Sequence, residues 1–146
     1  MKQAVDDFVK GKRVAVVGVS RSGKKFGNMV YTELKERGYE AFAVNSSVQQ
    51  IDGEPCYPNV TALKDKVDGV VVCVSSEQAK PILQEAAGVG LRNVWLQQGA
   101  ETPELVKLGH DLGLNMVSGK CILMYAQPVR SFHAWHRAFA RLFGQL

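Results

Sequence analysis

The sequence has 146 residues, the usual size of one domain and enough to bury a core. Hydrophobic residues make up 46% of it and charged residues 22%, the formal net charge is +4, and no apolar run approaches the ~20 residues of a membrane span. The N-terminal residues include acidic ones where a signal peptide would have an apolar stretch, and the sequence has no basic run of the kind that binds nucleic acid. Its three cysteines, Cys56, Cys73 and Cys121, are far apart and odd in number, which suits neither a disulfide framework nor a zinc site. We therefore expect a single cytoplasmic domain over residues 1–146, without a metal site, a membrane span or a nucleic-acid partner.

Apolar runs alternate with amphipathic segments along the chain. The predicted elements, in order, are a strand at 13–19, a helix at 26–37, a strand at 40–45, turns at 51–55 and 57–59, one or two helical turns at 60–66, a strand at 69–74, a helix at 77–87, a strand at 93–97, a helix at 102–112 and a strand at 114–118. This alternation requires right-handed parallel crossovers. The predicted fold is α/β: one Rossmann-like, doubly wound domain with a mainly parallel sheet of five or six strands and a core at about 12–122.

A different pattern follows residue 127. The spacing predicts an amphipathic C-terminal helix at about 128–143, with Arg130, Arg137 and Arg141 mostly off its apolar face. That face carries Phe132, Trp135, Phe139, Leu142 and Phe143. Such a helix packs on its own domain, forms a homodimer contact or lies on a membrane surface, and the sequence leaves these alternatives open.

The first strand ends at a glycine and feeds a small basic loop, residues 18–25, that opens a helix. This is how α/β proteins hold phosphate. The pattern predicts a nucleotide-like ligand, and it leaves dinucleotides, triphosphates and coenzyme A as candidates.

Two phosphate motifs nearly match and then fail. The dinucleotide fingerprint has Ser20 where its second glycine belongs, and Asn45 stands where a nicotinamide enzyme places an acid for the ribose. The triphosphate loop has Lys25 where a hydroxyl should hold magnesium, and Asp68 begins the third strand instead of ending it. No hydrolase motif is complete, so we predict no catalytic residue.

Several short segments, weak singly, occur in a specific order: 16–20, 25–28, 34–39, 43–45, 51–53, 94–99 and 119–122. Together they resemble the small stand-alone CoA-binding proteins related to the CoA-binding domain of the succinyl-CoA synthetase alpha subunit, from about Lys12 to Ile122. The sequence departs from the family's pattern at Ser46 and Ser47, where relatives read proline and often a basic residue soon after. Which basic residue holds the adenosine phosphate therefore stays open.

The resemblance implies a site for coenzyme A at the carboxyl ends of the strands. By the family's pattern the phosphate contacts are Gly18, Ser20, Arg21, Lys24 and Lys25, and Phe26 and Gly27 belong to the same cofactor-binding site. Val44 and Asn45 would lie beside the adenosine. The pantetheine arm would pass Val74, Ser75 and Gln78, with Gln97 and Cys121 at later strand ends. A branched side chain at Gly18 is expected to weaken binding without unfolding the protein, because it would occupy the space where backbone and ligand approach each other.

The expected function is binding of coenzyme A or an acyl-CoA, a small-molecule partner, without catalysis of the chain's own, since the synthetase's other domains have no room here. Two alternatives stay open. One is an NAD(P)-binding oxidoreductase or redox sensor, and the other is an interaction module that binds no ligand and acts through the C-terminal helix.

Overall fold

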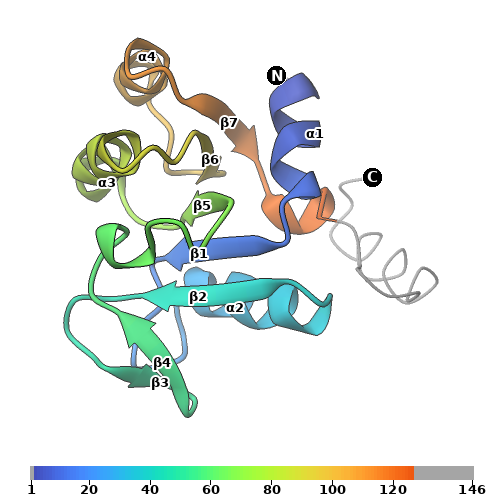
Figure 1. The fold of residues 1–146 in the computed structure, drawn as a ribbon, viewed down its shortest axis with the longest axis vertical. Helices are drawn as coiled ribbons and strands as arrows, with labels where there is room; N and C mark the ends of the chain where they lie inside the picture. The colour runs from blue at the N-terminus through green and yellow to red at the C-terminus, as the bar shows by residue number, and fades with distance from the viewer. Residues whose placement is uncertain (1, 127–146) are drawn as a thin grey trace.

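The computed structural model describes residues 2–126, and its strands form one sheet in the order β3-β4-β2-β1-β5-β6-β7 (Figure 1). The elements are α1 (Lys2–Lys10), β1 (Arg13–Val17), α2 (Phe26–Glu36), β2 (Glu40–Val44), β3 (Gln50–Ile51), β4 (Glu54–Tyr57), the 3₁₀ turn η1 (Thr61–Leu63), β5 (Gly69–Val72), α3 (Ser76–Gly88), β6 (Asn93–Gln97), α4 (Pro103–Asp111), β7 (Asn115–Lys120) and the 3₁₀ turn η2 (Ile122–Met124). The helix predicted at about 128–143 lies outside the described residues.

All neighbouring strands are parallel except β3 and β4, which are antiparallel. The predicted α/β, doubly wound fold is confirmed, and the sheet has seven strands instead of the expected five or six. The difference arises at residues 50–57, which read as turns because both strands are so short. Asp52 and Gly53 have φ values of 52° and 79° and join the two strands, as an Asp-Gly pair does in a tight hairpin.

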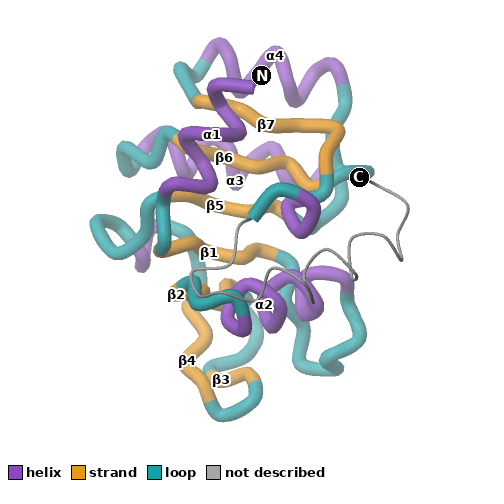
Figure 2. The backbone as a smooth tube through the Cα atoms, turned by 90° about the vertical axis from the view of Figure 1, so that its right-hand side faces the viewer, coloured by secondary structure: helices purple, strands orange, loops and turns teal. Residues whose placement is uncertain are grey.

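Helices cover both faces of the sheet (Figure 2). On one face, α1, α2 and η2 pack over Val16, Val71 and Trp95. The ring of Phe8 in α1 meets Trp95 edge to face, with 5.4 Å between the ring centroids. On the other face, α3, α4 and η1 cover a second core of aliphatic side chains. Across residues 2–126 no helix is both long and apolar enough to cross a membrane.

Helix α1 was not predicted. Its nine residues are mostly polar, but Ala4, Val5 and Phe8 fall on one face and are buried. Three apolar positions in a short polar segment are a weak helical signal. The helix forms because that face packs on β6 and β7, which come about a hundred residues later in the chain.

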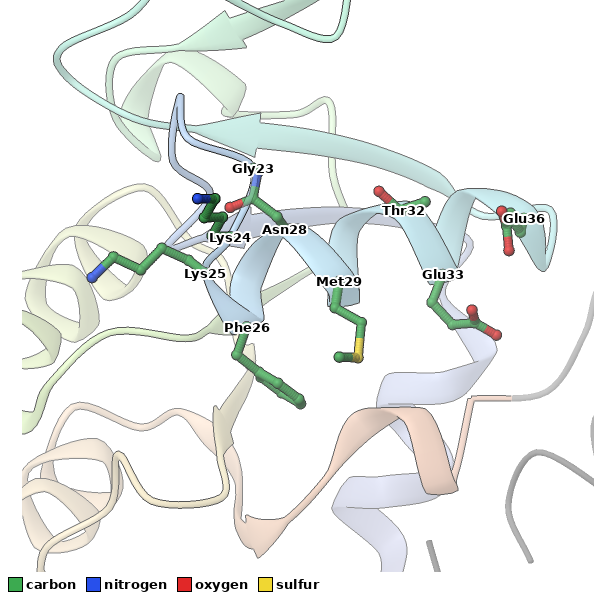
Figure 3. Close-up of a pocket in the computed structure, with 9 residues that line it drawn as sticks. All are labelled: Gly23, Lys24, Lys25, Phe26, Asn28, Met29, Thr32, Glu33 and Glu36. Atoms are coloured by element: carbon green, nitrogen blue, oxygen red, sulfur yellow. The ribbon is translucent and has the colours of Figure 1, made fainter. Parts of the chain in front are cut away.

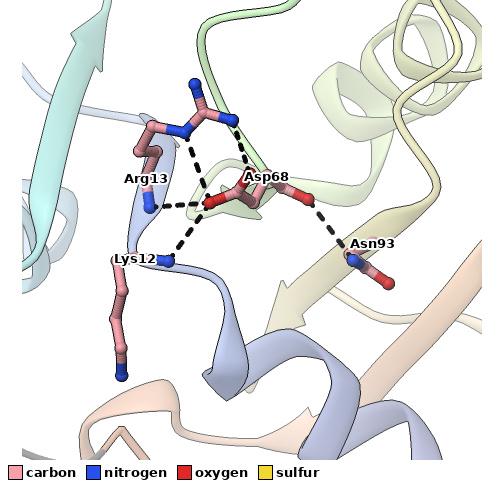
Figure 4. A network of polar contacts seen from close by, with 4 residues as sticks. All are labelled: Lys12, Arg13, Asp68 and Asn93. Atoms are coloured by element: carbon pink, nitrogen blue, oxygen red, sulfur yellow. Dashed lines mark hydrogen bonds and ion pairs between the residues drawn. The ribbon is translucent and has the colours of Figure 1, made fainter.

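At the amino ends of the strands, Asp68 joins β1 to the start of β5 (Figure 4). Its carboxylate accepts hydrogen bonds from the backbone N–H groups of Lys12 and Arg13, and it forms a 2.8 Å ion pair with the Arg13 guanidinium. The hydrogen bond from Arg13 holds the pKa of Asp68 below its usual range. Asn93 on β6 donates to the Asp68 carbonyl at 3.3 Å. This edge is therefore fastened by polar bonds between consecutive strands.

The polar series continues to the edge of the sheet. The Asn115 side chain on β7 donates to Asn93 Oδ1 at 3.0 Å and to Asp7 Oδ2 at 3.1 Å. Asp7 belongs to α1, so the first helix is bonded directly to the last strand. The side chains at the amino ends of the strands thus bond to each other, and the candidate binding site is described at the carboxyl ends.

Candidate functional site

The loop after β1, residues 18–25, lies at the carboxyl edge of the sheet and is shaped by two glycines. Gly18 has a φ of +117°, and a Cβ there would lie 2.5 Å from the carbonyl oxygen of Cys73 at the end of β5. A Cβ on Gly27 would meet the Gly18 carbonyl. Both glycines therefore allow protein backbones to approach each other. A side chain at Gly18 would strike the neighbouring strand, so the packing of the protein itself requires this glycine, and an approach of a ligand to the same backbone stays a prediction.

Asn28 fixes the start of this loop. Its Oδ1 accepts a hydrogen bond from the Ser20 backbone N–H at 2.9 Å, and its Nδ2 donates to the Ser20 carbonyl at 2.9 Å. The Ser20 hydroxyl also reaches Asn28 Oδ1, at 3.2 Å. Asn28 is 6% exposed, and sequence reasoning gave it no role although it ends the motif at 25–28. The sequence signal that could have identified Asn28 is an amide side chain in the first turn of a helix that follows such a loop.

The loop carries three cationic side chains. Arg21, Lys24 and Lys25 are exposed, and Lys25 occupies the N-cap position of α2 with an extended backbone and no side-chain cap. The amide groups and the positive dipole end of a helix favour an anion at this position. Lys25 points away from Phe26, which projects with Met29 on another side of the helix (Figure 3). Lys24 and Lys25 therefore lie at the N-terminus of α2, and Arg21 is exposed earlier in the same loop.

The end of β2 lies next to this loop. Asn45 Nδ2 donates to the Val19 carbonyl at 2.8 Å, and its Oδ1 accepts from the Ser47 backbone N–H at 2.7 Å. Its amide thus joins two loops. Val44 is 6% exposed and packs in the core beneath α3. A role for either residue beside an adenosine stays a prediction, and for Val44 the contact would come from the backbone.

The end of β5 leads directly into α3. Ser75 is the N-cap of this helix, and its hydroxyl accepts a hydrogen bond from the Gln78 backbone N–H at 3.4 Å. Ser75 and Gln78 are exposed, whereas Val74 is half-buried. Burial around the Cys73 thiol raises its pKa to about 12, and the nearby Cys121 thiol adds to the shift. Cys73 is therefore a packing residue, while Ser75 and Gln78 are open to solvent at the start of α3.

The remaining predicted residues lie further along the same edge. Gln97 is 3% exposed, and its Oε1 accepts a hydrogen bond from the Ile122 backbone N–H at 3.0 Å. Cys121 is half-buried and lines a hollow of about 210 Å³ together with Lys120 and Tyr125. The structure thus groups the loops of β1, β2 and β5, and it brings the Cys121 thiol close to that of Cys73 at the end of β5.

Comparison with known families identifies the family to which the chain belongs. A sequence profile of the family described as CoA binding domain matches residues 12–127. The chain belongs to this family of CoA-binding domains. The predicted resemblance is confirmed, and the matched range includes every residue predicted for the site.

The similar proteins include enzyme subunits and small proteins. Over 129 residues this CoA-binding domain is 27% identical to the acetate–CoA ligase (ADP-forming) II subunit alpha of Pyrococcus furiosus, a match that takes in 81% of this chain and 28% of that subunit. It is 26% identical over 113 residues to the uncharacterized protein YneT of Bacillus subtilis, covering 77% of this chain and 84% of that protein. The solved structure of a conserved hypothetical protein from P. furiosus is 32% identical, with a TM-score of 0.73 and coverage of 76% and 96%. The chain therefore spans less than a third of the ligase subunit and most of each small protein.

Proposed function

We propose that the protein binds coenzyme A or an acyl-CoA at the carboxyl edge of its sheet, with the diphosphate held by the loop after β1. The observation that carries the proposal is the position of Lys24 and Lys25 at the N-terminus of α2, which has no side-chain cap, in a loop that also carries exposed Arg21 in a CoA-binding domain. Coenzyme A supplies negative phosphates, and guanidinium, ammonium and amide donors are the groups that bind them. The donor set of the loop therefore fits this ligand.

The rest of the edge offers surfaces for the remainder of the molecule. Ser75 and Gln78 are exposed at the start of α3, in position to contact the pantetheine arm. The hollow at Cys121 lies beyond them and suits the thiol end, free or acylated. The proposal stops at binding, because the similarity to the acetate–CoA ligase subunit is confined to 28% of that subunit.

Asn45 favours coenzyme A over a nicotinamide dinucleotide. An NAD site uses a carboxylate at the end of the second strand to accept hydrogen bonds from ribose hydroxyls. Asn45 has no carboxylate, and its amide already bonds Val19 and Ser47. NAD is therefore the matched control ligand, because it shares the adenosine and diphosphate groups.

The test is thermal and calorimetric titration of the full chain with coenzyme A and with NAD. At a hundredfold excess over its Kd, coenzyme A should add about 2.7 kcal/mol to the free energy of unfolding, and NAD should add much less. Equal stabilisation by NAD would overturn the proposal.

A charge reversal locates the phosphate contact. Lys25→Glu should weaken binding, with a difference from the wild type that shrinks as salt is added. Lys64→Glu is the matched control, because Lys64 is exposed and precedes β5 at the opposite edge of the sheet. Unchanged affinity of Lys25→Glu at low salt would remove Lys25 from the site.

A further inference from the structure

One side of α2 carries an exposed apolar surface beside the candidate site. Phe26 and Met29 are 44% and 45% exposed, and they are the large hydrophobic side chains most open to solvent within residues 2–126. Their spacing of three places them on one side of the helix (Figure 3). A cleft of about 580 Å³ runs along this side from Gly23 to Glu36. We call this surface the α2 face.

The described part of the chain ends beside the same helix. Arg37, directly after α2, donates from Nη1 to the carbonyl of Leu123 at 2.9 Å and to that of Ala126 at 3.0 Å. Its Nε forms a buried ion pair with Glu33 Oε1 at 3.1 Å. Arg37 is 3% exposed, so this junction is fixed in the core. The segment 127–146 therefore starts at the C-terminal end of the α2 face.

The composition of this segment complements the face. It carries three arginines and no acidic residue, and it contains Phe132, Trp135 and Phe139 at helical spacing. The α2 face has exposed Glu36 at the end where the segment starts, and Lys24 and Lys25 at its opposite end. From Glu36 to Phe26 the helix measures about 15 Å, a distance that about ten helical or five extended residues span. Length and apolar content thus agree along the face, and charge agrees at the end where the segment starts.

We propose that the C-terminal segment 127–146 packs along the α2 face and covers Phe26 and Met29. A second copy of the chain could present the same segment, but the covalent connection at Ala126 gives the chain's own segment an effective concentration in the millimolar range. The intramolecular arrangement is therefore favoured. This inference does not depend on the identity of the ligand.

Trypsin cleavage of the full chain tests the packing, since the segment offers cleavage sites at Arg130, Arg137 and Arg141. The wild-type segment should be released more slowly than a synthetic peptide of residues 127–146 is cut. Phe26→Ser/Met29→Ser should speed its release by about tenfold or more, because each buried side chain of this size contributes at least that factor. Val106→Ser is the control, because Val106 lines a groove on α4 instead.

The outcomes separate the possible occupants. Circular dichroism and urea unfolding establish that the double variant keeps its fold. If the double variant releases the segment at the wild-type rate, or the wild-type segment is cut as fast as the free peptide, the α2 face is not its partner. Protection that falls on dilution, with a dimer seen by light scattering, would assign the face to a second copy and overturn the proposal. Protection that is independent of concentration and lost in the double variant supports it.

Discussion

Replacing Gly18 by alanine tests why the turn after β1 requires a glycine. The new Cβ would lie 2.5 Å from the Cys73 carbonyl oxygen, and the backbone would have to keep a φ of +117°. Left-handed backbone costs an L-residue about 1–2 kcal/mol, and overpacking against a neighbouring strand costs about 1–3 kcal/mol more. The total of about 2–5 kcal/mol is a large part of the 5–15 kcal/mol typical for a domain.

Gly23→Ala is the matched control. Gly23 has a φ of +74° in the same loop, but a Cβ there meets nothing within 4 Å. It should cost only the backbone term, about 1–2 kcal/mol. Urea unfolding measures both variants, and at a slope of about 2 kcal/mol/M the clash should lower the midpoint of Gly18→Ala by a further 0.5–1.5 M or so. A Gly18→Ala protein as stable as Gly23→Ala, but with weaker coenzyme A binding, would refute the clash and restore the ligand-approach explanation.

Three further predictions concern other parts of the structure. Asn28→Ala should lower the free energy of unfolding by about 1–3 kcal/mol and weaken coenzyme A binding, because the Ser20 backbone groups lose their partner; a drop confined to stability would separate the loop from the ligand. Iodoacetamide at pH 8 should label Cys73 far more slowly than Cys121, because with a pKa of about 12 only about one Cys73 thiol in ten thousand is ionised. Mass spectrometry of the labelled peptides measures both rates, and early labelling of Cys73 would contradict its burial. The pKa of Asp68 is lowered in the folded state, so its contribution to stability is complete above the ordinary aspartate pKa and is lost as pH falls through the lowered value. The difference in unfolding free energy between the wild type and Asp68→Asn should accordingly shrink on acidification, and a difference independent of pH would rule out the ion pair as its source.

The central strands and the loop after β1 could be predicted because each is encoded by consecutive residues. Apolar runs such as 69–72 become buried strands, and Gly18 with the basic residues after it marks a strand-to-helix turn. Helix α1 could not be predicted with the same means, since its stability comes from β6 and β7. The hairpin β3–β4 was hidden by its length, although Asp52-Gly53 is a usable hairpin signal.

The candidate site shows the same division. Sequence order places Lys25 and Ser75 at strand ends, and the fold does bring those ends to one edge. What a side chain does there depends on its neighbours in space, and Asn45 illustrates this, because its amide is engaged by Val19 and Ser47. Asn28 was missed for the same reason, since its partner is a backbone eight residues earlier. The spacing of residues along the sequence predicts where in the fold a side chain lies, and the contacts in the folded protein determine which hydrogen bonds it makes.

Helix α1 also has a consequence for biosynthesis. It is translated before the strands of the sheet, but the surfaces that hold it, Trp95 on β6 and Asn115 on β7, are made about 85 to 105 residues later. At about 5–20 residues per second this delay lasts roughly 5–20 s, during which a nine-residue helix has nothing to stabilise it. This helix precedes every strand along the chain and is nevertheless among the last elements to fold, and its docking onto β7 marks the completion of the sheet.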